Sequence, residues 1–125
     1  MQDCNVISKG SYSEFKFNDF VSVRQYLLVR EQGRKYLLLK LSNDGQNEVS
    51  TLKLTVRQLD VRGGVIKTES YTYDKVNAKP GAKFVLKDKI PLLEGCVEVG
   101  VTLDEAHFGN YTYAIRSNEL VVSYE

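Results

Sequence analysis

The single histidine of the chain, His107, follows two carboxylates, Asp104 and Glu105. A histidine can act as a general base when a hydroxyl nucleophile and an orienting carboxylate lie within reach. No Gly-x-Ser-x-Gly elbow accompanies His107, and adjacent side chains such as Asp104 and Glu105 diverge on a strand. We therefore interpret His107 as a loop residue at a strand end. We predict no catalytic residue and expect a protein that is not an enzyme, with a small hydrolase as a distant alternative.

Oxygen-bearing side chains gather in one polar segment that contains Asn43, Asp44, Asn47 and Glu48. Calcium takes about six to eight oxygen ligands, but this spacing does not match an EF-hand. Asn-Asp-Gly is also a common turn sequence, so a turn is favoured over a calcium site. One histidine and two distant cysteines lack the paired spacing of a zinc site. We predict neither a metal nor a cofactor.

Two similar tripeptides, Tyr71-Thr72-Tyr73 and Tyr111-Thr112-Tyr113, are the candidate binding residues. Residues two apart share one face of a strand. Half-exposed tyrosines give a large contact area at a low entropic cost, which suits recognition of a protein or a glycan. The favoured alternative is an aromatic ladder that only stabilises the sheet. The tentative binding patch consists of Tyr71, Tyr73, Tyr111 and Tyr113.

The two cysteines, Cys4 and Cys96, leave the redox compartment open. Cys96 begins an alternating strand on the side predicted to face solvent or a second layer. A disulfide between them would require an oxidising compartment and Cα atoms within about 7 Å of each other. Two unrelated free thiols are the favoured interpretation.

The charge of the chain is almost balanced, with 17 Lys and Arg against 16 Asp and Glu. A net charge of +1 provides no general attraction for nucleic acid or anionic lipid. Five lysines nevertheless fall close together, and we interpret them as a solvated face. They are Lys75, Lys79, Lys83, Lys87 and Lys89.

No apolar run approaches the roughly 20 residues of a membrane-spanning helix, and no signal peptide is evident. We expect no membrane insertion by this domain. The chain is either cytoplasmic or a domain cut from a longer exported protein. The abrupt end directly after the apolar Leu120-Val121-Val122 slightly favours the second, with an extracytoplasmic location at the cell surface. The oligomeric state stays open.

Short runs of alternating apolar residues, separated by turn signals, must position all of these side chains. Clear examples are 37–41, 52–56 and 97–103, with turns at 42–45 and 63–64. A period of two buries one face of each strand. We predict that residues 1–125 form a single all-β domain, an immunoglobulin-like antiparallel sandwich of about seven to nine strands. A small closed barrel is the main alternative.

The expected strands cover 21–30, 35–42, 51–60, 65–73, 82–86, 96–103, 111–116 and 120–124. A bulge is predicted near Gln58 and Leu59, 90–95 is expected to be a connection, and 104–108 a loop or one helical turn. The predicted core contains Leu39, Leu41, Leu54, Val56, Phe84, Val97, Val99 and Val101.

Four segments together resemble bacterial FxLYD-type and related immunoglobulin-like domains over Tyr36 to Leu103. They are 39–44, 52–56, the Asp-x-x-Gly hairpin 60–66 and the Pro-Gly turn segment 79–84. The Phe-x-Leu-Tyr-Asp signature itself is absent, and Arg57-Gln58-Leu59-Asp60 stands near its place. The resemblance implies a non-catalytic interaction or spacer module of a bacterial, surface-associated protein. The alternative is a stand-alone cytoplasmic protein that binds a protein partner at a sheet edge.

Overall fold

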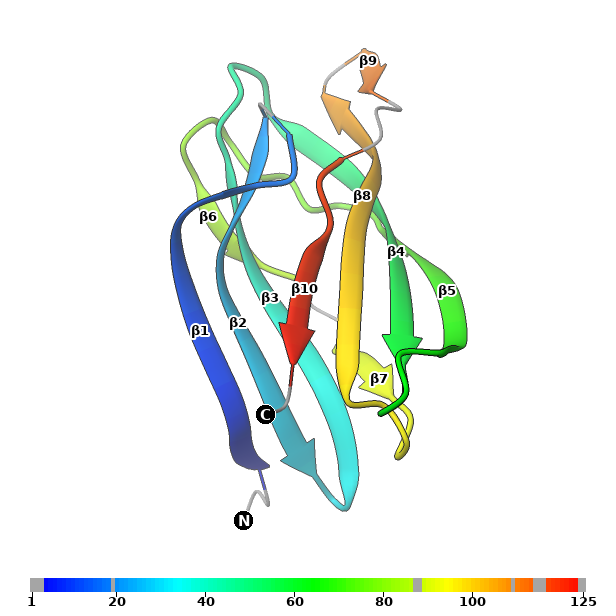
Figure 1. Cartoon of the computed structure of the whole chain (residues 1–125). Coiled ribbons are helices and arrows are strands. Elements are labelled where there is room, and N and C mark those ends of the chain that lie inside the picture. The colour runs from blue at the N-terminus through cyan, green and yellow to red at the C-terminus, as the bar shows by residue number, and fades with distance from the viewer. Residues whose placement is uncertain (1–3, 19, 87–88, 109, 114–116, 124–125) are drawn as a thin grey trace.

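The computed structural model describes residues 4–18, 20–86, 89–108, 110–113 and 117–123, with side chains from residue 15 onward except that of Tyr113. These residues form ten β-strands and no helix (Figure 1). The strands are β1 (Cys4–Lys16), β2 (Val21–Glu31), β3 (Arg34–Asn43), β4 (Val49–Leu59), β5 (Val65–Tyr73), β6 (Lys83–Val85), β7 (Ile90–Leu92), β8 (Glu98–Phe108), β9 (Tyr111–Tyr113) and β10 (Leu120–Ser123).

The strands form two antiparallel sheets that pack face to face (Figure 1). The first has the order β1-β2-β3-β6. β7 also pairs with β3, along a different part of that strand than β6. The second has the order β10-β8-β4-β5, and β9 pairs with β8. The predicted all-β antiparallel sandwich is confirmed.

The core lies between the sheets and contains side chains from both. Six of the eight residues predicted to be buried are so: Leu39, Leu41, Leu54, Val56, Val99 and Val101. Phe84 is half-buried and packs against the core from the edge strand β6. Val97 is also only half-buried, because it precedes β8 rather than belonging to it. Alternation therefore identified the interior well inside strands and less well at their ends.

The hairpin between β4 and β5 has the predicted Asp-x-x-Gly form. The Asp60 carboxylate accepts hydrogen bonds of 2.9 Å from the backbone N–H groups of Arg62 and Gly64. Gly63 has a φ of 82°, a left-handed conformation that glycine adopts without a steric penalty. These bonds close the turn between β4 and β5.

Three expectations about strand boundaries are wrong. The polar N-terminal segment forms the long edge strand β1, and the expected connection at 90–95 contains β7. The segment 104–108 is neither loop nor helix, because β8 continues to Phe108. A bulge at Asp104 makes this possible: Leu103 pairs with Leu54, and Glu105 pairs with Lys53. The extra residue reverses the alternation, so that Ala106 and Phe108 are buried after it.

A second bulge, at Arg24, changes which residues of β2 face the core. Val23 pairs with Leu41 and Gln25 pairs with Lys40, which leaves Arg24 between them without a partner on β3. Leu28 therefore takes the inward position and is fully buried, whereas Leu27 is half-exposed. The alternation along the expected strand 21–30 therefore changes beyond this bulge.

Buried polar side chains hold the crossover from β7 to β8. The Lys35 ammonium donates to the carbonyls of Glu94 and Cys96, at 3.0 and 3.2 Å. The Gln58 amide accepts from the backbone N–H of Leu93 at 2.7 Å. The predicted register shift near Gln58 is present in the pairing with β5, but β4 itself keeps its alternation, so Gln58 occupies a core-facing position.

Candidate functional site

His107 lies within β8, not in a loop, and forms a network on the outer face of the second sheet. Its Nε2 atom is 3.3 Å from the Glu105 carboxylate, and its Nδ1 atom is 3.3 Å from the hydroxyl of Thr112 on β9. Lys53 on β4 forms an ion pair of 3.5 Å with the same carboxylate. The structure thus brings a carboxylate, a histidine and a hydroxyl together on an open sheet surface. None of the hollows described below includes His107.

A polar hollow of about 500 Å³ lies beside this network and is lined by Arg57, Thr102, Asp104, Ser117 and Glu119. Arg57 and Glu119 form a two-pronged ion pair, with Nε–Oε2 and Nη2–Oε1 distances of 2.8 and 2.7 Å. Asp104 accepts a short hydrogen bond from Thr55. The Ser117 hydroxyl accepts from the N–H of Leu103 at 2.7 Å. Four of the five lining residues therefore already have hydrogen-bond partners within the protein.

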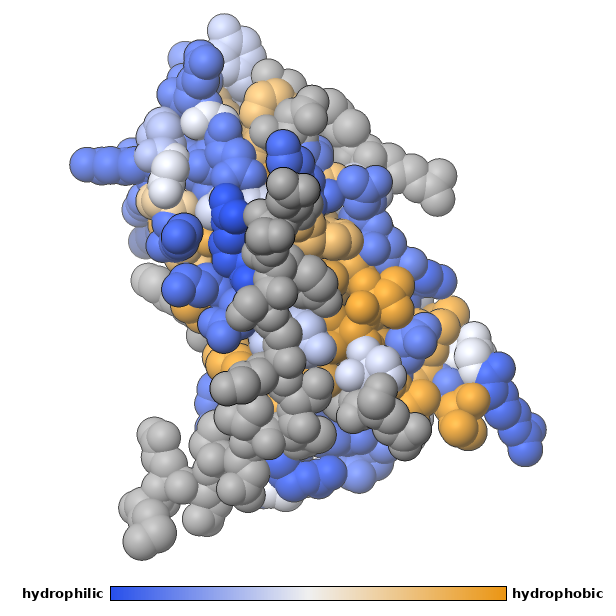
Figure 2. Space-filling model, turned by 60° about the vertical axis from the view of Figure 1, so that its left-hand side comes forward, coloured by the Kyte–Doolittle hydropathy of each residue, from blue (hydrophilic) through white to orange (hydrophobic). Residues whose placement is uncertain are grey.

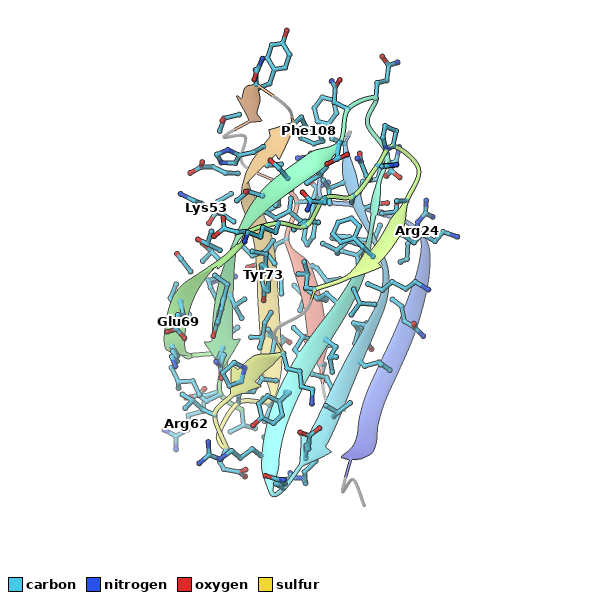
Figure 3. The ribbon with its side chains drawn as sticks, turned by 180° about the vertical axis from the view of Figure 1, so that it is seen from behind. Arg24, Lys53, Arg62, Glu69, Tyr73 and Phe108 are labelled. Atoms are coloured by element: carbon cyan, nitrogen blue, oxygen red, sulfur yellow. The ribbon has the colours of Figure 1, made fainter. Side chains whose placement is uncertain are left out.

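A groove with both polar and apolar lining lies between the last residues of β5 and the strand β6. Its volume is about 310 Å³, and its lining comes from two segments, 72–76 and 84–86. We call it the β5–β6 groove; it is lined by Thr72, Tyr73, Asp74, Lys75, Val76, Phe84, Val85 and Leu86. Figure 3 shows Tyr73 in the space between β5 and β6, seen from behind. The groove thus joins the edges of the two sheets.

The segment after β5 adopts an unusual backbone along this groove. Lys75 and Asn77 have φ values of 57° and 49°, in the left-handed region. Asparagine tolerates this region, but a lysine there costs roughly 1–2 kcal/mol. Hydrogen bonds from the N–H groups of Val76 and Ala78 to the start of β4, at 2.9 and 3.0 Å, hold the segment in place. Conformational strain of this kind is concentrated at functional sites.

The free edge of β6 exposes backbone hydrogen-bonding groups beside the groove. The N–H of Asn43 donates to the carbonyl of Ala82 at 3.0 Å, and the N–H of Leu86 donates to that of Leu39 at 3.1 Å. Because hydrogen-bonded residues alternate along an antiparallel strand, Lys83 and Val85 direct their N–H and C=O groups away from β3. Among the described strands, β6 has no neighbour on that side.

The two tyrosine pairs do not form one continuous patch in the described residues. Tyr71 and Tyr73 lie on the inner face of β5, where Tyr73 is buried and Tyr71 is half-buried. Tyr111, on β9, is 66% exposed, and β4 and β8 separate it from β5. The ring of Tyr113 lies outside the described residues. Only Tyr73 lines the groove.

Tyr71 and Glu69 interact on the inner face of β5. The Tyr71 hydroxyl donates to the Glu69 carboxylate at 2.9 Å, and Lys67 forms an ion pair of 3.1 Å with the same carboxylate. The hydrogen bond from Tyr71 and the contact with Lys67 lower the pKa of Glu69. Burial, together with this hydrogen bond, raises the pKa of Tyr71 well above its ordinary value.

Three lysines of the predicted lysine cluster surround the β5–β6 groove. Lys75, Lys79 and Lys83 are exposed and form no ion pair with a described residue. Lys89 behaves differently, because it pairs with Glu31 at 2.5 Å and lies 5.6 Å from the centre of the Tyr36 ring. Lys87 lies outside the described residues. Lys75, Lys79 and Lys83 are thus solvated as expected, whereas Lys89 is not part of that face.

The segment considered for calcium forms a turn built around the fully buried Asn43. Its amide nitrogen donates to the carbonyls of Asn47 and Ala78, at 2.8 and 2.9 Å, and its amide oxygen accepts from the N–H of Gly45 at 2.9 Å. Asn43 thereby ties β3 to the segment that follows β5. Within the described ranges, no three His, Cys, Asp or Glu side chains are grouped as metal ligands.

Cys96 corrects the expectation for the thiols. It is fully buried in the core and is a free cysteine. Its thiol donates to the carbonyl of Glu98 at 3.3 Å. The residue precedes β8 in the loop that Lys35 holds, so it turns inward rather than continuing the strand alternation. Cys4 is the first residue of β1, and its side chain lies outside the described residues.

Exposed hydrophobic side chains belong to several elements of the fold. Figure 2 shows hydrophobic side chains grouped on part of one face among hydrophilic ones. The largest exposed hydrophobic residues are Val61, Val65, Ile66, Val85, Leu93, Tyr111 and Val121. Val85 borders the groove, and isolated apolar side chains elsewhere are normal on a folded protein.

Comparisons of the chain with protein-family models, curated proteins and solved structures gave no match. No helix in the described parts of the chain is long and apolar enough to cross a membrane. Any function must therefore be argued from the chain's own residues.

Proposed function

We propose that this protein is a non-catalytic interaction module that binds a protein partner along the β5–β6 groove. The observation that carries this proposal is the position of a groove with an apolar part directly beside the free edge of β6. Val76, Phe84 and Leu86 provide apolar contacts, while Lys83 and Val85 offer unpaired backbone groups. An extended peptide uses both features when it adds a strand to a sheet.

The arrangement of the strands supports an immunoglobulin-like relationship. The order β10-β8-β4-β5 corresponds to the G-F-C-C′ sheet of variable-type immunoglobulin domains. The neighbouring strands β2-β3-β6 correspond to A-B-E, with β1 as an additional edge strand. On this proposal the protein belongs to the accessory modules of bacterial surface proteins that the sequence resembles. A stand-alone cytoplasmic protein would use the same groove.

The edge strand β5, on the other side of the groove, is less suited to adding a strand. Its inward side carries Lys67 and Glu69, which pair with each other. Inward-pointing charges on an edge strand discourage pairing with another chain. The groove near Tyr73 and β6 is therefore the favoured position for a partner.

Selection of peptides from a random display library on the native protein tests the proposal. We expect the selected peptides to shift the backbone amide NMR signals of Val76, Lys83 and Val85. Val85→Pro should abolish binding, because it removes an N–H at the free edge without removing a bond to β3. The matched variant Val85→Thr keeps the N–H and should still bind.

Thermal unfolding must show that both variants remain folded. Peptides that shift signals only elsewhere, or that bind Val85→Pro as tightly as Val85→Thr, would contradict the proposal.

A further inference from the structure

The apolar part of the groove suits one large side chain. The whole groove has a volume of about 310 Å³, at the lower end of the range for ligand pockets, and the apolar part is smaller. Tyr73 and Leu86 form its buried floor, and the half-buried Phe84 and Val76 form its sides. These four side chains are the apolar part of the lining, beside the polar Thr72, Asp74 and Lys75. An aromatic or branched aliphatic residue of a partner therefore fits this position better than a polar one.

The backbone beside this position limits the partner to an extended segment. Lys83 and Val85 are the two residues of β6 whose N–H and C=O groups face away from β3. Successive residues of an added strand point to opposite faces of the sheet. One side chain of such a strand would enter the groove. The side chains directly before and after it would face the solvent on the side of Lys83.

The charges around the groove are mostly positive, and its lysines form no ion pair within the described part of the chain. Lys75 lines it, Lys83 belongs to its edge strand, and Lys79 lies in the loop between them. None of the three forms an ion pair with a described residue. The one acidic residue in the lining is Asp74, whose carboxylate accepts a hydrogen bond of 3.4 Å from Thr51. The potential of the rim therefore favours negative groups.

We infer that the partner is an extended acidic peptide segment with one large apolar residue. The segment pairs with the free edge of β6, places its apolar side chain among Tyr73, Val76 and Phe84, and directs carboxylates to Lys75 and Lys83. This inference rests on the proposed function and names the chemistry of its partner. It also gives a role to the lysines, which the sequence pattern alone assigns to a solvated surface.

A fluorescent eight-residue peptide with one central phenylalanine among alternating threonines and glutamates is the probe. Fluorescence anisotropy should show binding that weakens when NaCl rises from about 0.05 to 0.5 M, because salt screens exposed charges. The double variant Lys75→Glu with Lys83→Glu should weaken binding about tenfold or more. Arg62→Glu reverses an equally exposed charge at the distant β4–β5 hairpin and is the matched control (Figure 3).

Three further peptides separate the parts of the inference. Replacing the phenylalanine by alanine, or methylating alternate backbone nitrogens, should abolish binding. A peptide with lysines in place of the glutamates should not bind. Binding of this lysine peptide at the groove, with equal or higher affinity, would overturn the acidic partner and leave the proposed function intact. Lack of any shift at Val76, Lys83 and Val85 with all peptides, including those selected by display, would overturn both.

Discussion

The Tyr71 hydroxyl donates a hydrogen bond of 2.9 Å to the Glu69 carboxylate on the inward-facing side of β5. These residues pair across the sheet with Leu54 and Val56, which are buried. A carboxylate therefore occupies a position where the next strand carries core side chains. Glu69 remains exposed because β5 is the outermost strand of its sheet. Its charge and its bond to Tyr71 protect the edge from pairing with another chain.

This contact predicts a loss of stability at alkaline pH. Burial and the bond to Glu69 raise the pKa of Tyr71 in the folded state above its ordinary value of 10.0. The resulting stabilisation is complete below about pH 10 and decreases as the pH rises toward the folded-state pKa. Urea unfolding between about pH 8 and 11 should therefore show a steeper loss of stability in the wild type than in Tyr71→Phe.

The Glu69 end of the contact acts at acidic pH with the opposite sign. The pKa of Glu69 is lowered from 4.5, so its contribution to stability is present above that pH and is lost as the pH falls toward the folded-state pKa.

Tyr111→Phe, on β9, is the control for losing one tyrosine hydroxyl in the alkaline experiment. Equal alkaline slopes for the wild type and Tyr71→Phe would contradict this role of the contact.

Val99→Asp should unfold the protein or destabilise it by several kcal/mol, because Val99 is fully buried between the sheets. Val121→Asp is the matched control, since Val121 is 50% exposed on the neighbouring strand β10. We expect that control to change the free energy of unfolding by less than about 1 kcal/mol. Circular dichroism during urea unfolding measures both. Similar losses in the two variants would mean that the core is not where the structure places it.

The thiol of Cys96 should resist modification in the native protein. In a Cys4→Ser background, a thiol reagent should label Cys96 only after unfolding, because the side chain is fully buried. Val121→Cys in the same background supplies an exposed thiol as the control. Complete labelling of Cys96 under native conditions, at the rate of the control, would be inconsistent with its position in the core.

Lys75→Gly should raise the free energy of unfolding by about 0.5–1 kcal/mol. Glycine adopts the left-handed conformation at this position without the penalty for a side chain, which outweighs its larger loss of backbone entropy. Lys79→Gly is the control, because Lys79 is exposed in the same loop without a positive φ. That control should be neutral or slightly destabilising. A lower thermal midpoint for Lys75→Gly than for Lys79→Gly would argue against backbone strain at Lys75.

The alternation of apolar residues was enough to predict the sandwich and most of its core. Leu52, Leu54 and Val56 are buried in one run, as expected, because a period of two is a local property of a strand. The hairpin at Asp60 could be predicted for the same reason. Its turn depends on residues that are neighbours in the sequence.

The bulges at Arg24 and Asp104 could not be predicted in this way. Each is defined by the strand with which it pairs, and each reverses the alternation that follows. The strand β1 was missed for a similar reason, because its composition is polar and its conformation is set by pairing with β2. Burial of Cys96 likewise depends on the loop that Lys35 and Gln58 hold in place.

The β5–β6 groove shows most clearly which features depend on local sequence and which depend on tertiary structure. The sequence by itself determined its ingredients: tyrosines on one face of β5, Phe84 and Leu86 on one face after the Pro-Gly turn, and a group of lysines. The tertiary structure decided that Tyr73 joins Phe84 in one groove and that Tyr111 lies two strands away from β5. Local spacing specifies the direction of a side chain along its own strand. Which strand lies opposite it is set by packing between sheets, which brings together residues distant in sequence.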